Sequence, residues 1–264
     1  MAIREDARNN HDALFPNHQS TLKKTDPELI EVFDNWAFGE LLEDKTLDVH
    51  TRLMVQLAAM IACGAVSEYR VMLGGALEVG VTPVEIKEIV YQAVPYVGMA
   101  KAFDFLHAAN EVLTERGVVL PLPDQSTTTP ENREAKGLIV QKQIVGEATV
   151  DTLYASASAD QLHIQHFLSA NCFGDYLTRN GIDVATRELL TFSMLVALGG
   201  CDPQVKGHIA ANLHVGNDRA RLIDVLTQLL PWIGYPRTLN GLRALDELTG
   251  GSEATGKPNK TASP

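Results

Sequence analysis

The chain has 264 residues, of which 45% are hydrophobic, and a formal net charge of -11. This length allows one large core or two smaller ones, and the acidic balance, without a run of lysine or arginine, argues against a nucleic acid partner. No apolar run reaches the roughly 18 residues of a membrane-spanning helix, and residues 1–27 are too polar for a signal-peptide core. We therefore expect a cytoplasmic protein that binds neither nucleic acid nor membrane.

Apolar residues recur at three- and four-residue spacing within each half of the chain, which predicts an all-helical fold. Thr82-Pro83-Val84-Glu85 is typical of a capping box with proline at the first helical position, so a helix is predicted from there to about Tyr96. Asp202-Pro203 predicts a similar start for a helix over residues 204–215.

The chain contains an internal repeat. The sequence QAVPYVG at 92–98 returns as QLLPWIG at 228–234, an offset of 136. Farther upstream, the pairs Phe38-Gly39 and Thr51-Arg52 return as Phe173-Gly174 and Thr186-Arg187, at an offset of 135. One residue has therefore been inserted between these blocks, and the loop at 199–203 is the expected place. Gly80 and Gly216 match across the repeat and stand where a helix ends in a left-handed residue.

The repeat predicts two units joined by a linker. Residues 121–134 are rich in Pro, Ser and Thr and cannot bury much apolar surface. We expect an N-terminal repeat at 1–120, this linker, a C-terminal repeat at 135–250 and a disordered tail at 251–264.

Several motifs of the second copy occur together in a known family. They are Thr-Arg-Glu-Leu-Leu-Thr at 186–191, Cys201, His208, Gly216 and PWIGYPR at 231–237. In these motifs the chain resembles the carboxymuconolactone decarboxylase family. The resemblance implies an all-α fold of two tandem alkylhydroperoxidase D-like helical repeats, and association of several chains into a ring, here a homo-oligomer that would be a trimer of tandem repeats.

The family implies two chemistries. One branch removes carbon dioxide from gamma-carboxymuconolactone without a cofactor, and the other uses a Cys-x-x-Cys pair with a nearby Glu and His for thiol redox chemistry. Cys201 and His208 match the first cysteine and the histidine of that motif, but Gln204 stands at the second cysteine. A disulfide cycle needs a resolving thiol, so the redox branch is disfavoured unless Cys172 folds close to Cys201.

Comparison of the copies indicates that the first is degenerate. At the positions of four reactive residues of the second copy, the first copy has a different residue type. The matching pairs are Glu188 and Leu53, His208 and Met72, Tyr235 and Met99, and Arg237 and Lys101. The first copy is therefore interpreted as a scaffold.

The resemblance and the residue types predict His208, Glu188 and Cys201 as catalytic, with Glu188 orienting His208. Each has a structural alternative. His208 could be a hydrogen-bonded core histidine, and Glu188 could be a carboxylate that is favoured by the helix dipole. Cys201 could be a buried thiol, since it would lie about 10 Å from His208 along a continuous helix.

Arg237, Tyr235 and Arg187 are predicted to bind substrate, since a guanidinium can hold a carboxylate through two hydrogen bonds and a hydroxyl can donate to a developing charge. Arg187 is matched by Arg52 in the first copy, so a structural ion pair is its alternative, and Tyr235 could instead pack around Trp232.

The histidines and carboxylates show no recognised metal-ligand spacing, so neither a metal nor a cofactor is expected. The favoured function is a cofactor-free decarboxylase that acts on a small carboxylate substrate, an unsaturated lactone acid of the gamma-carboxymuconolactone type. A thiol-dependent hydroperoxidase using Cys201 is the first alternative, and a non-catalytic binding or assembly protein is the second.

Overall fold

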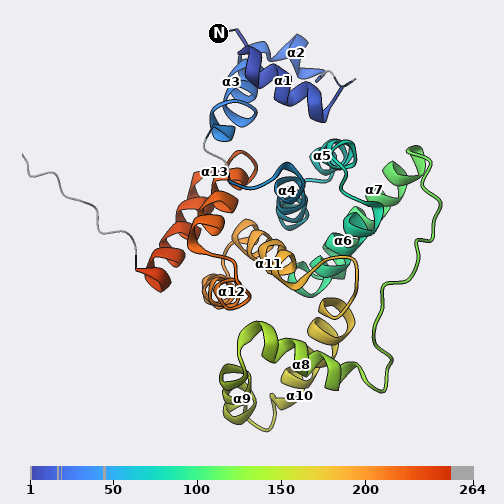
Figure 1. The fold of residues 1–264 in the computed structure, drawn as a ribbon, viewed down its shortest axis with the longest axis vertical. Helices are drawn as coiled ribbons and strands as arrows, with labels where there is room; N and C mark the ends of the chain where they lie inside the picture. Colours follow the sequence, from blue (N-terminus) through green and yellow to red (C-terminus); the bar gives the residue numbers. More distant parts are fainter. Residues whose placement is uncertain (1, 17, 19, 44–45, 251–264) are drawn as a thin grey trace, which may run out of the picture.

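The structure, a computed structural model, describes residues 2–16, 18, 20–43 and 46–250, and within these ranges its regular elements are all helical (Figure 1). The expected all-α fold is confirmed. The predicted tail at 251–264 lies outside the described residues. The elements of the first copy are α1 (Glu5–Leu14), α2 (Leu22–Thr25), α3 (Pro27–Ala37), the 3-10 helix η1 (Glu40–Leu42), α4 (Val49–Cys63), α5 (Val66–Glu78), α6 (Pro83–Val97) and α7 (Met99–Glu115).

The second copy begins with α8 (Arg133–Val145), α9 (Glu147–Ser156), α10 (Leu162–Phe167) and the π-helix η2 (Leu168–Leu177). It continues with α11 (Val184–Leu198), α12 (Asp202–His214) and the long α13 (Arg219–Thr249). The backbone of α13 is non-helical at Gly234, with φ 77° and ψ 166°, and Gly98 has a similar conformation, φ 83° and ψ 150°, between α6 and α7. The two halves of α13 therefore correspond to α6 and α7.

The helix boundaries confirm the repeat and its insertion. α4 and α11 have 15 residues each and are offset by 135, whereas α5 and α12 have 13 residues each and are offset by 136. The extra residue therefore lies between Leu198 and Asp202, in the loop where the sequence predicts it.

Local sequence signals define most of these ends. The Thr82 hydroxyl accepts from the Glu85 amide, and the Glu85 side chain accepts from the Thr82 amide, so the predicted capping box is present. Gly80 and Gly216 have φ of 89° and 98°, as their places after helix ends predict. The start of α12 differs from the prediction, because Cys201 is its N-cap and makes no side-chain cap hydrogen bond.

The two copies share one hydrophobic core. α4 and α11 pack directly on each other, and α6 and α13 pack against them from the opposite copies. Figure 1 shows the segment between α7 and α8 passing along the outside of these helices. The predicted linker thus joins two sequence repeats that are buried against each other.

A buried ion pair between Arg187 and Glu88 ties the copies together. Arg187 on α11 donates from Nη2 to Glu88 on α6, at 3.0 Å, and both side chains are buried. At the equivalent place, the charge of Asp224 on α13 opposes the lowering of the Arg52 pKa by burial. The Arg187–Glu88 pair joins the second copy to the first and so helps to fix how α6 lies against α11, next to the site described below.

Candidate active site

Glu188 and His208 meet between α11 and α12. The Nδ1 atom of His208 lies 2.8 Å from Oε2 of Glu188. The Glu188 side chain is fully buried, whereas 18% of the His208 side chain is exposed. A carboxylate only accepts hydrogen bonds, so this contact places a proton on Nδ1 and leaves Nε2 as the second reactive nitrogen of the ring.

Asn212 holds the two helices in register at this point. Its Nδ2 donates to the carbonyls of Glu188, at 3.0 Å, and His208, at 2.7 Å. Its Oδ1 accepts from Asn217 at 2.9 Å. These hydrogen bonds fix the backbone that carries both ionisable side chains. The Glu188–His208 geometry is therefore held by the Asn212 hydrogen bonds as well as by the contact between the two side chains.

The first copy contributes Tyr96 to the site. Its ring lies edge-on to the His208 imidazole, with centroids 5.7 Å apart and an interplanar angle of 78°. The Cys172 thiol, on η2, donates to the Tyr96 hydroxyl at 3.9 Å. Burial raises the pKa of the Tyr96 hydroxyl well above its usual value, and the charge of Glu188 acts in the same direction. The hydroxyl is therefore protonated at neutral pH and can serve as a hydrogen-bond donor.

This contribution differs from the interpretation of the first copy as a mere scaffold. Tyr96 belongs to the repeated QAVPYVG motif, where the second copy has Trp232. Sequence reasoning missed Tyr96 and considered Cys172 as a possible partner of Cys201. The difference between Tyr96 and Trp232 is the signal that could have drawn attention to this position, because it gives the first copy the hydroxyl in an otherwise matching motif.

One oxygen of the site has no protein partner. Among the described residues, Oε1 of Glu188 is buried and accepts no hydrogen bond, while Oε2 pairs with His208. Buried polar atoms are usually hydrogen-bonded, so an unpaired one calls for an explanation such as a bound water molecule or ligand. Oε1 of Glu188 is available to accept from either.

Cys201 lies in a different environment from the Glu188–His208 pair. Its thiol donates to the Leu195 carbonyl at 3.3 Å, and burial, together with the charge of Asp202, raises its pKa. Burial also raises the pKa of Cys172 to about 12. All three cysteines of the chain are free. The two thiols that a disulfide cycle would need are thus engaged with different partners, and neither has the lowered pKa of a reactive thiol.

Arg187 is buried in a complete set of protein partners. It donates to Glu88, to Gln92 and to the backbone carbonyls of Arg179, Asn180 and Ile182, and only 1% of its side chain is exposed. This geometry favours the structural ion pair over a role in substrate binding.

The other two predicted substrate ligands lie on the surface. The Tyr235 side chain is 59% exposed and stacks on Trp36, with centroids 6.2 Å apart. Arg237 is exposed, and its Nη1 lies 4.0 Å from the sulfur of Cys63. The structure therefore brings Glu188 and His208 together and places Tyr235 and Arg237 in other surroundings.

In the part of the chain that the structure describes, no group of three or more His, Cys, Asp or Glu side chains is arranged to hold a metal ion. A search of the same residues also found no helix that combines the length and the apolar character needed to cross a bilayer.

The fold and site define a duplicated, all-helical protein with a glutamate–histidine pair at a helix–helix contact. The family model described as Carboxymuconolactone decarboxylase family matches residues 27–111 and again residues 163–247. The chain therefore belongs to this family, as a member with two copies in tandem.

A curated relative is the 4-carboxymuconolactone decarboxylase of Acinetobacter baylyi (strain ATCC 33305 / BD413 / ADP1), to which the chain is 32% identical over 83 residues. The aligned segment covers 31% of this chain and 62% of the relative. The match therefore spans less than two thirds of the relative's own length.

Proposed function

We propose that this protein is a cofactor-free decarboxylase of an unsaturated lactone acid of the gamma-carboxymuconolactone type, with Glu188, His208 and Tyr96 as its active centre. The observation that carries the proposal is the buried Glu188 carboxylate bound to Nδ1 of a partly exposed His208. A histidine held in this way is the usual arrangement for transfer of a proton to or from a substrate.

The substrate supplies its own electron sink. When the bond between carbon and the carboxylate breaks, carbon dioxide leaves and the electron pair passes into the conjugated lactone, which becomes an enolate. A proton must then be delivered to carbon. In the proposed mechanism His208 delivers it from Nε2, Glu188 stabilises the charged imidazolium, and the Tyr96 hydroxyl donates to the enolate oxygen. Solvent then returns the proton to His208.

The partners of Arg187 bear on how the substrate is held. Since its guanidinium is occupied by Glu88, Gln92 and backbone carbonyls, it has no role in this mechanism. Protonated His208 supplies the positive charge next to the substrate carboxylate. Arg237 and Tyr235 stay predictions as substrate ligands, and the mechanism does not depend on them.

The test compares two histidines of one helix. His208→Ala should lower kcat for gamma-carboxymuconolactone by about 10²- to 10⁴-fold, the usual contribution of a general acid or base. His214→Ala, at the exposed end of α12, should leave turnover unchanged. Carbon dioxide release measures activity, and circular dichroism and light scattering check the fold and size of both variants. Full turnover by a folded His208→Ala protein would overturn the proposal.

The hydroperoxidase alternative has less support. It requires a thiol of low pKa at Cys201, whereas burial raises the pKa of this thiol. A non-catalytic binding protein would tolerate replacement of Glu188, His208 and Cys201 without loss of function. It would release no carbon dioxide from the lactone, so the assay of the unmodified protein separates that alternative from the lyase.

A further inference from the structure

We propose that the cavity between α6, the segment at 120–125 and Arg179 is a second binding site, for a small carboxylate with a flat apolar body. It goes beyond the proposed function and does not rest on it. The cavity has a volume of about 410 Å³, within the range of small-molecule sites. Its lining residues do not include Glu188, His208 or Tyr96.

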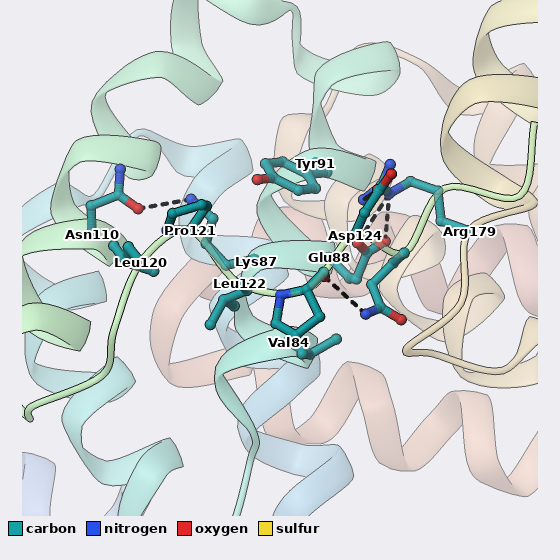
Figure 2. A pocket seen from close by; sticks show the side chains of 12 residues that line it. Val84, Lys87, Glu88, Tyr91, Asn110, Leu120, Pro121, Leu122, Asp124 and Arg179 are labelled. Atoms are coloured by element: carbon teal, nitrogen blue, oxygen red, sulfur yellow. Dashed lines mark hydrogen bonds and ion pairs between the residues drawn. The ribbon is translucent and has the colours of Figure 1, made fainter. Parts of the chain in front are cut away.

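Two cations flank one aromatic ring in this cavity. Figure 2 shows Tyr91 between Lys87 on one side and Arg179 on the other. Nζ of Lys87 lies 5.2 Å from the centre of the ring, and the guanidinium carbon of Arg179 lies 5.1 Å from it. Lys87 also donates to Asn110 at 2.8 Å, which leaves two of its three ammonium hydrogens for a ligand.

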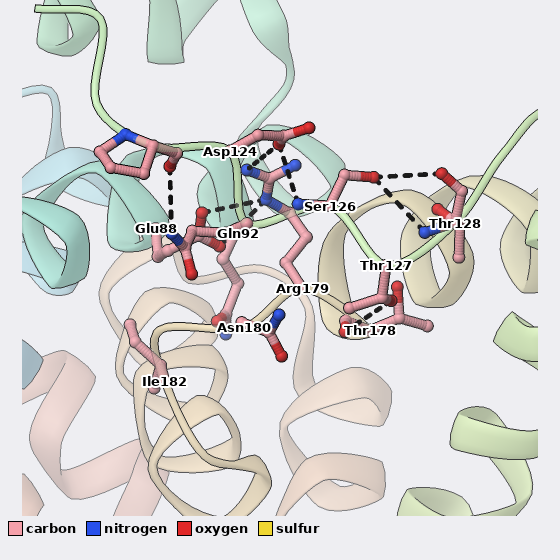
Figure 3. Close-up of polar contacts among 12 residues, drawn as sticks. Glu88, Gln92, Asp124, Ser126, Thr127, Thr128, Thr178, Arg179, Asn180 and Ile182 are labelled. Carbon is pink, nitrogen blue, oxygen red and sulfur yellow. Dashed lines mark hydrogen bonds and ion pairs between the residues drawn. The ribbon is translucent and has the colours of Figure 1, made fainter.

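Arg179 is oriented with its outer nitrogens available. Its Nε donates to both oxygens of Glu88, at 3.0 and 3.1 Å, which fixes the guanidinium plane. Figure 3 shows the same side chain reaching toward Asp124, and Nη2 lies 3.9 Å from Asp124 Oδ1, beyond hydrogen-bond distance. The Arg179 side chain is 16% exposed, and that of Asp124 is 81% exposed. A guanidinium held through Nε can present its two Nη atoms to a carboxylate.

The local charge balance favours an anion. Glu88 is buried and is shared by Arg179 and by Arg187 behind it, at 3.0 Å each. With Lys87, and with Arg187 counted behind the cavity wall, the cluster contains three cations and two carboxylates. One of these carboxylates, Asp124, is 81% exposed at the rim, where water screens its charge. Burial lowers the pKa of Lys87, so the cavity contains an ammonium group that would gain from a negative neighbour.

The remaining wall is apolar and firmly held. Residues 120–123 read Leu-Pro-Leu-Pro and line the cavity opposite α6, with Val84 beside them. The segment is bound to the second copy, because the backbone amide of Asn180 donates to the Gln125 carbonyl at 2.9 Å. The Thr127 hydroxyl also donates to the Thr178 carbonyl at 2.9 Å (Figure 3). A preformed apolar wall beside two cations matches a ligand with a carboxylate at one end and a flat hydrocarbon part at the other.

The experiment uses the full chain with the His208→Ala substitution, so that binding at the active centre contributes as little as possible. Benzoate is the probe, benzamide supplies the ring without the charge, and inorganic phosphate supplies charge without the ring. Calorimetric titration should show benzoate binding more tightly than either. Lys87→Met, which keeps the length of the side chain, should weaken benzoate binding at least about tenfold.

Arg116→Gln is the matched control, since Arg116 is an exposed cation of the same copy that pairs with Glu78 outside this cavity. It should leave benzoate affinity unchanged. Arg179→Lys keeps the charge but loses the paired Nη atoms, and should also weaken binding. Equal affinity for benzamide or phosphate, or unchanged benzoate affinity in Lys87→Met, would overturn the proposal, whatever the activity of the unmodified protein toward lactones.

Discussion

Nδ1 of His208 lies 2.8 Å from Oε2 of Glu188, and this contact joins side chains 20 residues apart on neighbouring helices. The Glu188 carboxylate is fully buried, whereas the His208 imidazole is partly exposed to solvent. Glu188 can therefore fix the tautomer and the orientation of the ring, and His208 can exchange a proton with a substrate and then with water.

Glu188→Gln tests that orienting role. Glutamine keeps the size of the side chain but carries no charge to stabilise the imidazolium, so we expect kcat for the lactone to fall about a hundredfold with KM little changed. Ser193→Ala is the control, because Ser193 is buried on the same helix and its hydroxyl donates to the Leu189 carbonyl of that helix. Steady-state kinetics measure both. A kcat near that of the unmodified protein in Glu188→Gln would contradict the orienting role.

Tyr96→Phe tests the contribution of the first copy. The ring contact with His208 is kept and the hydroxyl donor is lost, so kcat should fall about a hundredfold, the usual cost of one donor to a developing negative charge. Tyr69→Phe is the matched control, since the buried Tyr69 hydroxyl finds no hydrogen-bond partner among the residues that the structure describes. It should keep full turnover and equal or greater stability. Unchanged kcat in Tyr96→Phe would remove Tyr96 from the mechanism.

Arg187→Met separates a structural from a binding role. Removing one partner of a buried ion pair leaves Glu88 with Arg179 alone, so the free energy of unfolding should fall by about 3 kcal/mol. Arg237→Gln, on the surface, should change it by less than about 0.5 kcal/mol. Urea denaturation measures both. A folded Arg187→Met protein of normal stability with a raised KM would instead show that Arg187 binds substrate.

The thiols should ionise only at high pH. A raised pKa means that the neutral thiol persists to higher pH, and with a pKa of about 12 only about one Cys172 in 10⁵ is a thiolate at pH 7. We expect its alkylation by iodoacetamide to accelerate through pH 10 without a plateau, measured by mass spectrometry with Cys172→Ala as the reference. A plateau below pH 8 at Cys201 would favour the hydroperoxidase.

The predicted trimer can be tested at exposed hydrophobic side chains that match across the repeat. Met99 and Phe103 on α7 match Tyr235 and Leu239 on α13 across the repeat, and all four side chains are exposed. Covering such residues is a common reason for subunit association. Light scattering should give the mass of three chains, and Leu239→Glu should lower it, whereas Leu29→Glu, also exposed but on α3, should not. A monomer at micromolar concentration would contradict the proposal.

The sequence alone determined the features that depend on neighbouring residues. The capping box at Thr82, the glycines after helix ends and the one-residue insertion before α12 follow from local backbone constraints, and each was found where it was predicted. The family resemblance also identified Glu188 and His208, which the structure joins.

Only the tertiary structure decided which side chains from different copies meet. The guanidinium of Arg187 is of the chemical type that binds anions, yet packing of α11 on α6 buries it against Glu88. Tyr96 belongs to the copy without the Glu–His pair, yet the same packing carries its ring to His208. Such contacts depend on how helices that are far apart in the chain pack against each other. The sequence pattern predicts which face of a helix is buried, but it does not predict which other helix covers that face.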